Sequence, residues 1–295
     1  MLASLVFGCP GLDWSPIDHL ETFAGTQAVT IGDWQAGRKA VPFEINMDPS
    51  TMDILTDAGF ANAVYYTLRT RVGGASLHAP VCSTWVLLSR GSTLRSKSQP
   101  LGRPDSLKVQ EGNVMIARVM VLCVLAAATA SWWVVEQPSS SIMEYHPTFQ
   151  KTLALLRGVR KLSICMANYG GESRKGTYLY SSHRCIDSLL DERSSPQLQE
   201  GSAPEMTIKY RDGAGKWRCK GGKDLKKSQH YPLKFGKALA KIRSKHRRQV
   251  RKAARQFLKE AVATENSLDT RVKINGHWLK HANLTPVLQF LSSVQ

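Results

Sequence analysis

Short apolar runs alternate with amphipathic stretches through the first two thirds of the chain. Apolar runs predict strands at 20–25, 40–45, 75–82, 131–135, 161–166 and 177–181. Stretches of helical character lie between them, reaching Gly37 after the first run and then covering 54–70, 111–129 and 143–156. Strands and helices that alternate at this spacing predict an α/β fold with a parallel, doubly wound sheet up to about residue 190.

The last third has a different pattern. Residues 191–204 are polar and rich in Ser, Pro and Glu, which is typical of a linker. Residues 205–235 predict small strands or loops, and 235–263 predict one long helix dense in Lys and Arg. We therefore expect an α/β domain over 1–190, a linker over 191–204 and a small, basic, mainly helical region over 205–295.

One segment fits two different structures. Residues 119–135 carry no charge, but a membrane-spanning helix needs about 20 apolar residues. The segment also divides into a buried helix, 111–129, and a strand, 131–135, which ends abruptly at Glu136. We favour the buried helix and strand, with no membrane partner. A membrane-associated protein with a polybasic tail is the alternative.

The charge of the chain is concentrated near its end. The formal net charge is +17, while 42% hydrophobic and 21% charged residues are ordinary for a globular protein. Residues 1–195 carry 18 Lys and Arg against 16 Asp and Glu, whereas residues 196–295 carry 22 against 7. This asymmetry favours a nucleic-acid partner.

The basic helix supplies candidate phosphate contacts. These are Arg243, Lys245, Arg247, Arg248, Arg251 and Lys252. They would give salt-dependent affinity without sequence preference. A solvated helix or a nuclear-import signal is the alternative, and a neighbouring aromatic residue, Trp217, fits a small-domain core better than a base-stacking role.

The cysteines argue against a metal site and against disulfides. No two of the six have the spacing of a zinc knuckle or a redox pair. Because the chain is long and its start lacks the basic region of a signal peptide, we expect reduced thiols in an intracellular protein, with the nucleus preferred.

Candidate chemistry gathers at the ends of the expected strands. A glycine-containing turn, 23–37, follows the first strand, and Glu44 ends the second. Cys82 and Glu136 end later strands, and Arg174 precedes the last one. Open α/β sheets bind ligands at this edge. Each piece alone also has a structural explanation, such as a packed turn, an inert cysteine or a solvated charge.

Taken in order, these pieces resemble the cytosine carbon-5 DNA methyltransferases over roughly residues 20–182. In this family a Phe-x-Gly-x-Gly turn binds S-adenosylmethionine, followed by an acid on the next strand. The turn matches at Phe23, Gly25 and Gly32, and the acid at Glu44. Asp53 stands where the family has an acid beside the adenine.

The resemblance also covers the catalytic groups. It implies that Cys82 is the nucleophile that adds to carbon 6 of a flipped-out cytosine, that Glu136 holds the ring nitrogen and that Arg174 binds the ring oxygen. It implies a Rossmann-like sheet of methyltransferase type, S-adenosylmethionine as cofactor and DNA in preference to RNA as partner. Basic residues of the loop after the cysteine would close over the DNA: Arg90, Arg95 and Lys97.

Several positions depart from the family pattern. The paired glycines of the turn are replaced by Gln27 and Ala28, and the proline before the cysteine by Val81. Gln137 and Pro138 stand for Asn-Val, and Gly176 for the second arginine of the late motif. A catalytically inactive nucleic-acid-binding protein on the same fold is therefore the alternative to an active methyltransferase.

Overall fold

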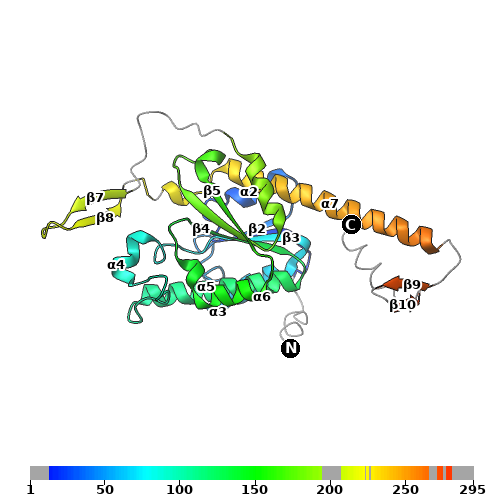
Figure 1. The fold of residues 1–295 in the computed structure, drawn as a ribbon, viewed down its shortest axis with the longest axis horizontal. Coiled ribbons are helices and arrows are strands. Elements are labelled where there is room, and N and C mark those ends of the chain that lie inside the picture. The colour runs from blue at the N-terminus through cyan, green and yellow to red at the C-terminus, as the bar shows by residue number, and fades with distance from the viewer. Residues whose placement is uncertain are drawn as a thin grey trace. The chain divides into compact units, whose positions relative to one another are not determined.

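The computed structural model describes residues 13–194, 207–222, 224–225, 227–265, 271–274 and 277–280. The chain divides into two compact units, Met1–Ile242 and Arg243–Gln295. A six-stranded sheet forms the centre of the first unit (Figure 1). Its strands are β1 (Ile17–Thr22), β2 (Ala40–Phe43), β3 (Thr70–His78), β4 (Trp132–Pro138), β5 (Arg160–Cys165) and β6 (Gly176–Ser181).

The strand order is β2-β1-β3-β4-β6-β5. Strands β2, β1, β3 and β4 pair in parallel, whereas β6 is antiparallel to both β4 and β5. The sequence pattern predicted only parallel strands. Residues 166–175 join β5 to β6 without a crossover helix, and so short a connection makes neighbouring strands antiparallel. The predicted α/β class with a mostly parallel, Rossmann-like sheet is confirmed, apart from the direction of β6.

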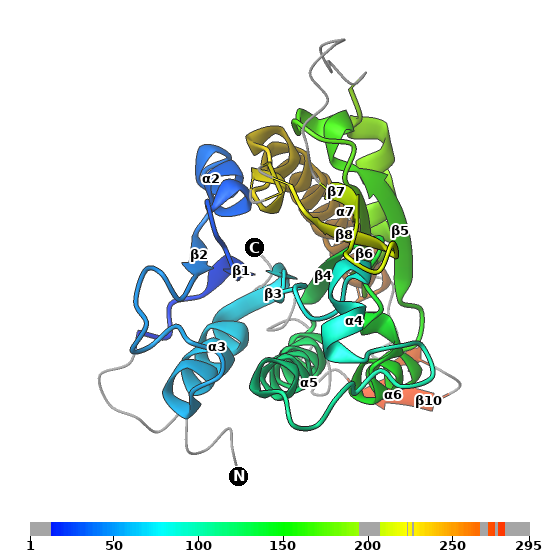
Figure 2. The same ribbon diagram turned by 90° about the vertical axis from the view of Figure 1, so that its left-hand side faces the viewer.

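Helices cover both faces of the sheet (Figures 1 and 2). One face packs against α3 (Asp57–Arg69), α5 (Leu107–Ala128) and α6 (Pro147–Leu155). The other packs against α2 (Ala28–Gln35), the 3-10 helix η4 (Arg184–Glu192) and the beginning of α7 (Leu233–Glu265). Strand β4 shows the division most clearly, because Trp133 and Val135 join the first core whereas Trp132 and Val134 join the second.

Helix α5 is long and apolar enough to cross a membrane, at 22 residues. Its sequence is also that of a core helix. Eight of its residues are buried, and most of them belong to the hydrophobic core between the sheet and helices α3, α5 and α6. The eight are Val109, Gly112, Ile116, Val119, Met120, Leu122, Cys123 and Ala126. The packing thus agrees with the buried helix and strand expected over 111–135.

The basic third contains more strand than its composition suggests. A short hairpin is formed by β7 (Thr207–Arg211) and β8 (Trp217–Gly221), and a second by β9 (Arg271–Ile274) and β10 (His277–Lys280). Helix α7 supplies the expected long basic helix and continues from the first unit into the second. Most of the proposed linker, 191–204, lies outside the described residues.

Helix α2 and the beginning of α7 meet backbone against backbone. A methyl group added at Gly32 would lie 2.5 Å from the carbonyl carbon of Gly236, and one added at Gly236 would lie 2.0 Å from the oxygen of Ala28. Two glycines therefore allow this crossing, which Figure 2 shows beside the sheet.

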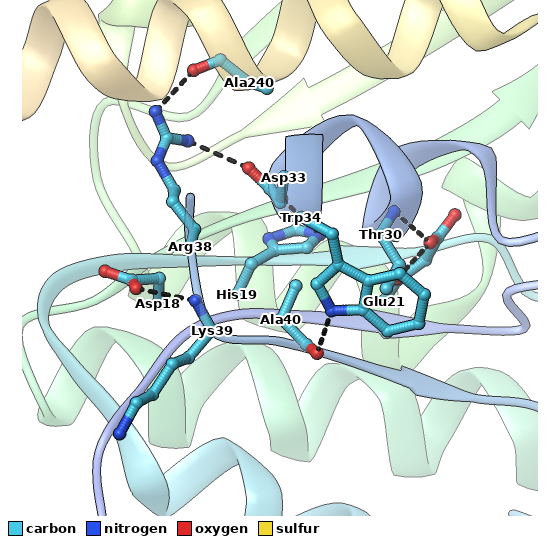
Figure 3. Close-up of polar contacts among 10 residues, drawn as sticks. All are labelled: Asp18, His19, Glu21, Thr30, Asp33, Trp34, Arg38, Lys39, Ala40 and Ala240. Atoms are coloured by element: carbon cyan, nitrogen blue, oxygen red, sulfur yellow. Dashed lines mark hydrogen bonds and ion pairs between the residues drawn. The ribbon is translucent and has the colours of Figure 1, made fainter. Parts of the chain in front are cut away.

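Buried polar groups reinforce the same contact (Figure 3). Arg38 donates to Asp33 at 2.9 Å and to the α7 carbonyl of Ala240 at 2.7 Å. Asp33 is fully buried, and its second oxygen lies 4.0 Å from Nε2 of His19 on β1. One guanidinium thus joins the end of α2 to α7, and its carboxylate partner faces the first strand.

Substituting Gly32 tests the crossing. Gly32→Ala would push a methyl group into backbone that cannot rotate away, so we expect a loss of about 1–3 kcal/mol in the free energy of unfolding. Gly91→Ala is the matched control, since its added methyl group meets open space. Urea unfolding of both variants measures the difference, and equal stabilities would contradict the close approach.

Another buried group, His78, joins the ends of two strands. Its Nδ1 lies 2.8 Å from the hydroxyl of Thr22 on β1, and its Nε2 lies 2.9 Å from the hydroxyl of Ser76. Burial lowers the pKa of His78 to about 3. The ring is therefore neutral, with one nitrogen donating and the other accepting.

The depressed pKa of His78 makes stability depend on pH. In the unfolded chain the ring takes a proton below its ordinary pKa of 6.5, whereas the folded ring stays neutral down to about pH 3. The stabilisation is complete above pH 6.5 and is lost as pH falls toward 3, with about 2 kcal/mol lost at pH 5. We expect His78→Gln to flatten the fall in urea stability between pH 7 and 5. An unchanged slope would show that His78 is not responsible.

Candidate functional site

The ends of four parallel strands bring the candidate groups to one edge of the sheet. Glu44 follows β2, Cys82 follows β3 after a short loop, and Glu136 lies near the end of β4. The turn after β1 lies between them, because β1 is the neighbour of both β2 and β3. This is the edge at which open α/β sheets bind ligands.

The turn from β1 to α2 has an unusual backbone. Phe23, Gly25 and Gln27 all have positive φ, at 59°, 50° and 59°. Only glycine adopts this region without strain, so Phe23 and Gln27 each cost about 1 kcal/mol. Gly25 is exposed, and a methyl group added there would meet open space. The turn therefore presents open backbone at Gly25.

Glu44 holds this turn in place. Its Oε2 accepts the Gly25 N–H at 2.9 Å, and its Oε1 accepts the side-chain amide of Asn46 at 2.9 Å. The residue is buried, so these bonds fix the position of its carboxylate. Phe23, Gly25 and Glu44 are thus brought together as the sequence predicted, in a position where an acid and open backbone could hold the ribose and amino-acid parts of a nucleotide-like cofactor.

A second carboxylate, Glu21, was not anticipated. It is fully buried near the end of β1, and its Oε2 accepts both the backbone N–H of Thr30 at 2.7 Å and its hydroxyl at 2.6 Å (Figure 3). A negative charge near the first turn of α2 is favourable to the helix. The sequence signal was an acid inside an apolar strand just before the turn.

Two further cofactor candidates have structural surroundings. Gly32 lies inside α2 at the crossing with α7, not in the turn. Asp53 lies before α3, where its Oδ1 accepts the Leu55 N–H at 2.9 Å and its carbonyl accepts the Thr56 N–H at 3.0 Å. These contacts explain both residues by packing and by helix initiation, and their cofactor roles stay predictions.

The loop that carries Cys82 is fastened to the end of β4. The Gln137 amide donates to the Pro80 carbonyl at 2.7 Å, and its oxygen accepts the Ser141 hydroxyl at 3.0 Å. The Cys82 carbonyl also accepts the Trp85 N–H at 2.9 Å. Gln137, one of the departures from the family pattern, is therefore a positioning residue for the cysteine loop.

A lysine lies between the acid and the thiol. Nζ of Lys175 is 3.6 Å from Oε1 of Glu136, and both side chains are largely buried. Burial raises the pKa of the Cys82 thiol, the Lys175 ammonium opposes this, and the Glu136 carboxylate adds to it. The Tyr231 phenol is a further donor toward this carboxylate, since the two side chains share a hydrogen bond.

The structure differs from the sequence prediction in which cation it brings to the site. Arg174 is exposed, whereas the neighbouring Lys175 faces Glu136 and influences Cys82. The two residues adjoin the start of β6, so their side chains leave the chain in different directions. The motif indicated a basic residue here but could not fix which of two adjacent ones points inward.

An aromatic residue from far along the sequence completes the site. Burial raises the pKa of the Tyr231 phenol well above its ordinary value, and the nearby groups Glu136, Glu21 and Cys82 raise it further. The Tyr231 ring also lies 5.3 Å from that of Phe235 at the beginning of α7. Sequence analysis missed Tyr231 because nothing in the local pattern places it beside β4.

One basic residue of the loop after Cys82 has a buried side chain. Arg95 is 2% exposed, its Cζ lies 3.4 Å from the centre of the Trp85 ring, and its guanidinium donates to Asn113 at 2.8 Å and to the Val109 carbonyl at 2.9 Å. Burial also lowers the pKa of Arg95 to about 10. This burial corrects the sequence prediction for Arg95, since in this conformation the residue is structural and offers no surface to DNA.

The other basic candidates differ in exposure. Arg90 is half-buried, and Lys97 lies 5.2 Å from the centre of the Tyr145 ring. On α7, Lys245, Arg248 and Lys252 are exposed, Arg247 is half-buried and Arg243 is buried. The side chain of Arg251 lies outside the described part of the chain. A nucleic-acid role for these residues remains a prediction.

The described residues form neither a metal-binding cluster nor a disulfide. They contain no group of three or more His, Cys, Asp or Glu side chains that could bind a metal ion. Five of the six cysteines fall within them, and all five are free thiols: Cys82, Cys123, Cys165, Cys185 and Cys219.

Comparisons with known proteins find similarity among solved structures but not among sequences. No protein-family model matches the sequence, and no curated protein matches it. Among solved structures, the chain is similar to the crystal structure of S. pombe Dnmt2 methyltransferase, with 11% sequence identity and a TM-score of 0.37. The similarity covers 65% of this chain and 58% of that one, so less than two thirds of the other protein's length is spanned.

Proposed function

We propose that the protein transfers a methyl group from S-adenosylmethionine to cytosine in a nucleic acid. The observation that carries the proposal is the buried Glu136 carboxylate at the end of β4, whose Oε1 lies 3.6 Å from Nζ of Lys175 and which shares its surroundings with Cys82. A carboxylate, a thiol and a cation gathered at one edge of the sheet fit a heterocycle that needs a nucleophile and polar groups around it.

The residues around the β1–α2 turn fit the cofactor. Gly25 leaves space above open backbone, and the buried Glu44 carboxylate beside it can accept further hydrogen bonds from a ribose. Glu21 adds a negative charge to the same edge of the sheet. When bound, S-adenosylmethionine would supply a methyl group activated by a positive sulfonium, which these carboxylates favour electrostatically.

Cys82 would act on the base. Its thiolate adds to carbon 6 of the cytosine ring, which makes carbon 5 nucleophilic enough to take the methyl group. Loss of the carbon-5 proton and breakage of the carbon–sulfur bond then restore the ring and the thiolate. Glu136 would hold the ring nitrogen while charge develops there. Gln137 would hold the cysteine loop against the end of β4 through its bond to the Pro80 carbonyl.

Lys175 takes the position proposed for an arginine. Its ammonium lies beside Glu136 and favours the Cys82 thiolate, so it would serve both groups that approach the base. A positive charge next to a buried thiol is the usual way to lower its pKa toward the working pH. Arg174 would remain outside, able to contact the substrate backbone.

The alternative is a nucleic-acid-binding protein that keeps the fold without catalysis. One observation favours it, because Tyr231 lies beside Cys82, Glu136 and Glu21. A base that reaches Cys82 must therefore displace the ring or stack against it. The burial that raises the pKa of Cys82 also leaves less thiolate for attack.

The partner in both cases is proposed to be nucleic acid, with DNA preferred to RNA, in the nucleus of the cell. The charge distribution supports this, because residues 196–295 carry 22 Lys and Arg against 7 Asp and Glu. We also propose the division into an α/β domain over 1–190, a linker and a basic region.

Thiol reactivity tests the electrostatics of the site. Lys175→Met removes the charge that lowers the pKa of Cys82, and Glu136→Gln removes one that raises it. We expect iodoacetamide labelling of Cys82 near pH 8 to change roughly threefold, slower in the first variant and faster in the second. Mass spectrometry measures labelling of Cys82, with Cys185 as the internal control. Changes in the same direction would contradict the arrangement.

Methyl transfer tests the proposed reaction. We expect the wild-type protein to transfer a radiolabelled methyl group to a cytosine-containing oligonucleotide, and Cys82→Ala to lower the rate by more than a hundredfold. The cofactor affinity of Cys82→Ala, measured by calorimetry, should stay within about twofold of wild type. Glu44→Ala should weaken that affinity at least tenfold, because the turn loses its acid.

The controls separate the two functions. Glu172→Ala changes an exposed acid near the start of β6 and should alter neither cofactor affinity nor transfer. No cofactor heat from folded wild-type protein would contradict the methyltransferase. Cofactor binding with transfer that survives Cys82→Ala would contradict the role of the cysteine.

A further inference from the structure

The hairpin of β7 and β8 is strongly basic and open to solvent. Its residues 207–221 include five cations and one acid: Lys209, Arg211, Lys216, Arg218, Lys220 and Asp212. All five residues of β8 are exposed, and so are Lys209, Tyr210 and Arg211 on β7. An isolated two-stranded hairpin is marginally stable in water.

The hairpin also exposes two large aromatic rings. Trp217 is 63% exposed and Tyr210 is 42% exposed. This corrects the expectation that Trp217 is a core residue. Leaving an indole in water forgoes about 2 kcal/mol or more of burial energy, so the exposed ring suits a surface that a partner covers.

A cationic side chain lies over each of these two aromatic rings. Cζ of Arg211 lies 5.1 Å from the centre of the Trp217 ring, and Nζ of Lys220 lies 5.6 Å from that of Tyr210. The pairing register sets Arg211 opposite Trp217 and Lys209 opposite Cys219, whereas Tyr210 is opposite Arg218. Because directly opposite residues share a face and successive ones alternate, Trp217, Lys209 and Arg211 form one face, here named the Trp217 face.

The two faces differ in available charge. Arg218, on the Tyr210 face, binds Asp212 with Nε 2.7 Å from Oδ2. The acid of the hairpin therefore offsets a cation on that face. The Trp217 face keeps the more exposed ring together with Lys209 and Arg211.

The hairpin belongs to the same compact unit as the candidate site. Strand β8 contacts the 3-10 helix η1 (Leu87–Ser89), which follows the Cys82 loop by a few residues. The hairpin therefore lies close to the segment that follows the cysteine loop.

We propose that the Trp217 face of the β7–β8 hairpin is a docking surface for single-stranded nucleic acid. Trp217 stacks on a base, and Lys209 and Arg211 bind the flanking phosphates. The inference rests on the proposed nucleic-acid substrate and adds that the strand is unpaired where the hairpin holds it. Rings for stacking beside cations for phosphates are the combination that binds single strands without sequence preference.

Charge alone does not account for this combination. A duplex or a sulfated polysaccharide offers anions to Lys209 and Arg211 but no unstacked base to Trp217. A phosphate-binding patch would need only the cations. The exposed indole is what distinguishes a single strand from these other polyanions.

The test uses the full chain and a fluorescein-labelled oligothymidylate of about 12 nucleotides, followed by anisotropy. We expect Trp217→Ala to weaken binding by about tenfold and Trp217→Phe to restore most of it. Lys209→Ala should lower the salt slope of log K by about 0.7, the value for one phosphate contact on a single strand. Heparin affinity should stay unchanged in Trp217→Ala.

Two matched controls sit on the same molecule. Tyr210→Ala removes an exposed ring from the opposite face and should change the affinity less than threefold. Lys151→Ala removes an exposed cation from α6 and should leave the salt slope unaltered. Since all these side chains are exposed, the variants should fold like wild type, which circular dichroism checks.

Several outcomes would overturn the docking surface. Equal loss in Trp217→Ala and Tyr210→Ala would reject the assigned face. Loss in Lys209→Ala with none in Trp217→Ala, or equal affinity for a duplex of the same length, would show a charge-only surface. All measurements are made without cofactor and repeated in Cys82→Ala, so failure of the hairpin is distinguishable from failure of methyl transfer.

Discussion

The close contact between α2 and the beginning of α7 governs much of this structure. Gly32 and Gly236 let two helices touch backbone to backbone, and Arg38 joins them from Asp33 to the Ala240 carbonyl. Such a contact tolerates no side chain at its centre, so it fixes where α7 starts. An element some 200 residues from the first strand is thereby placed against the first helix.

This placement decides what surrounds the candidate site. With α7 fixed, Phe235 lies 5.7 Å from Tyr169 and 5.3 Å from Tyr231, and the segment before the helix reaches the carboxyl edge of the sheet. Tyr231 then lies near Glu136, Glu21 and Cys82. The site is therefore built from strand ends on one side and from the approach to α7 on the other.

The approximate positions of the strands in the central sheet could be predicted from the sequence. Apolar runs located all six strands of the sheet within a few residues, because strands buried on both faces, such as β4, are nearly uninterrupted in Val and Trp. It did not reveal that β6 is antiparallel, since direction depends on the length of the connection and not on the run itself. Small strands were among the expectations for 205–235, where β7 and β8 lie, whereas β9 and β10 were not expected.

The sequence could indicate which site residues lie together where they follow neighbouring parallel strands. Gly25 and Glu44 were paired correctly because consecutive parallel strands bring their ends together. Lys175 faces Glu136 in place of Arg174 because of the direction its side chain takes at the start of β6. Tyr231 reaches the same carboxylate through a contact between residues far apart in the sequence. Neither can be read from spacing, since both are set by tertiary packing.

Under the proposed function, the charges of the molecule would divide recognition of the substrate between two regions. At the sheet edge, Glu21, Glu44 and Glu136 are buried with Lys175 beside the last of them. These three buried carboxylates would repel a phosphate. They would accept hydrogen bonds from a neutral heterocycle and attract a sulfonium. The phosphates of a polyanion must therefore be held elsewhere, and the exposed cations of the β7–β8 hairpin and of α7 are the groups that can hold them. For the proposed substrate, a base would have to rotate out of its stack to enter the site, which an unpaired strand allows at a lower energetic cost than a duplex.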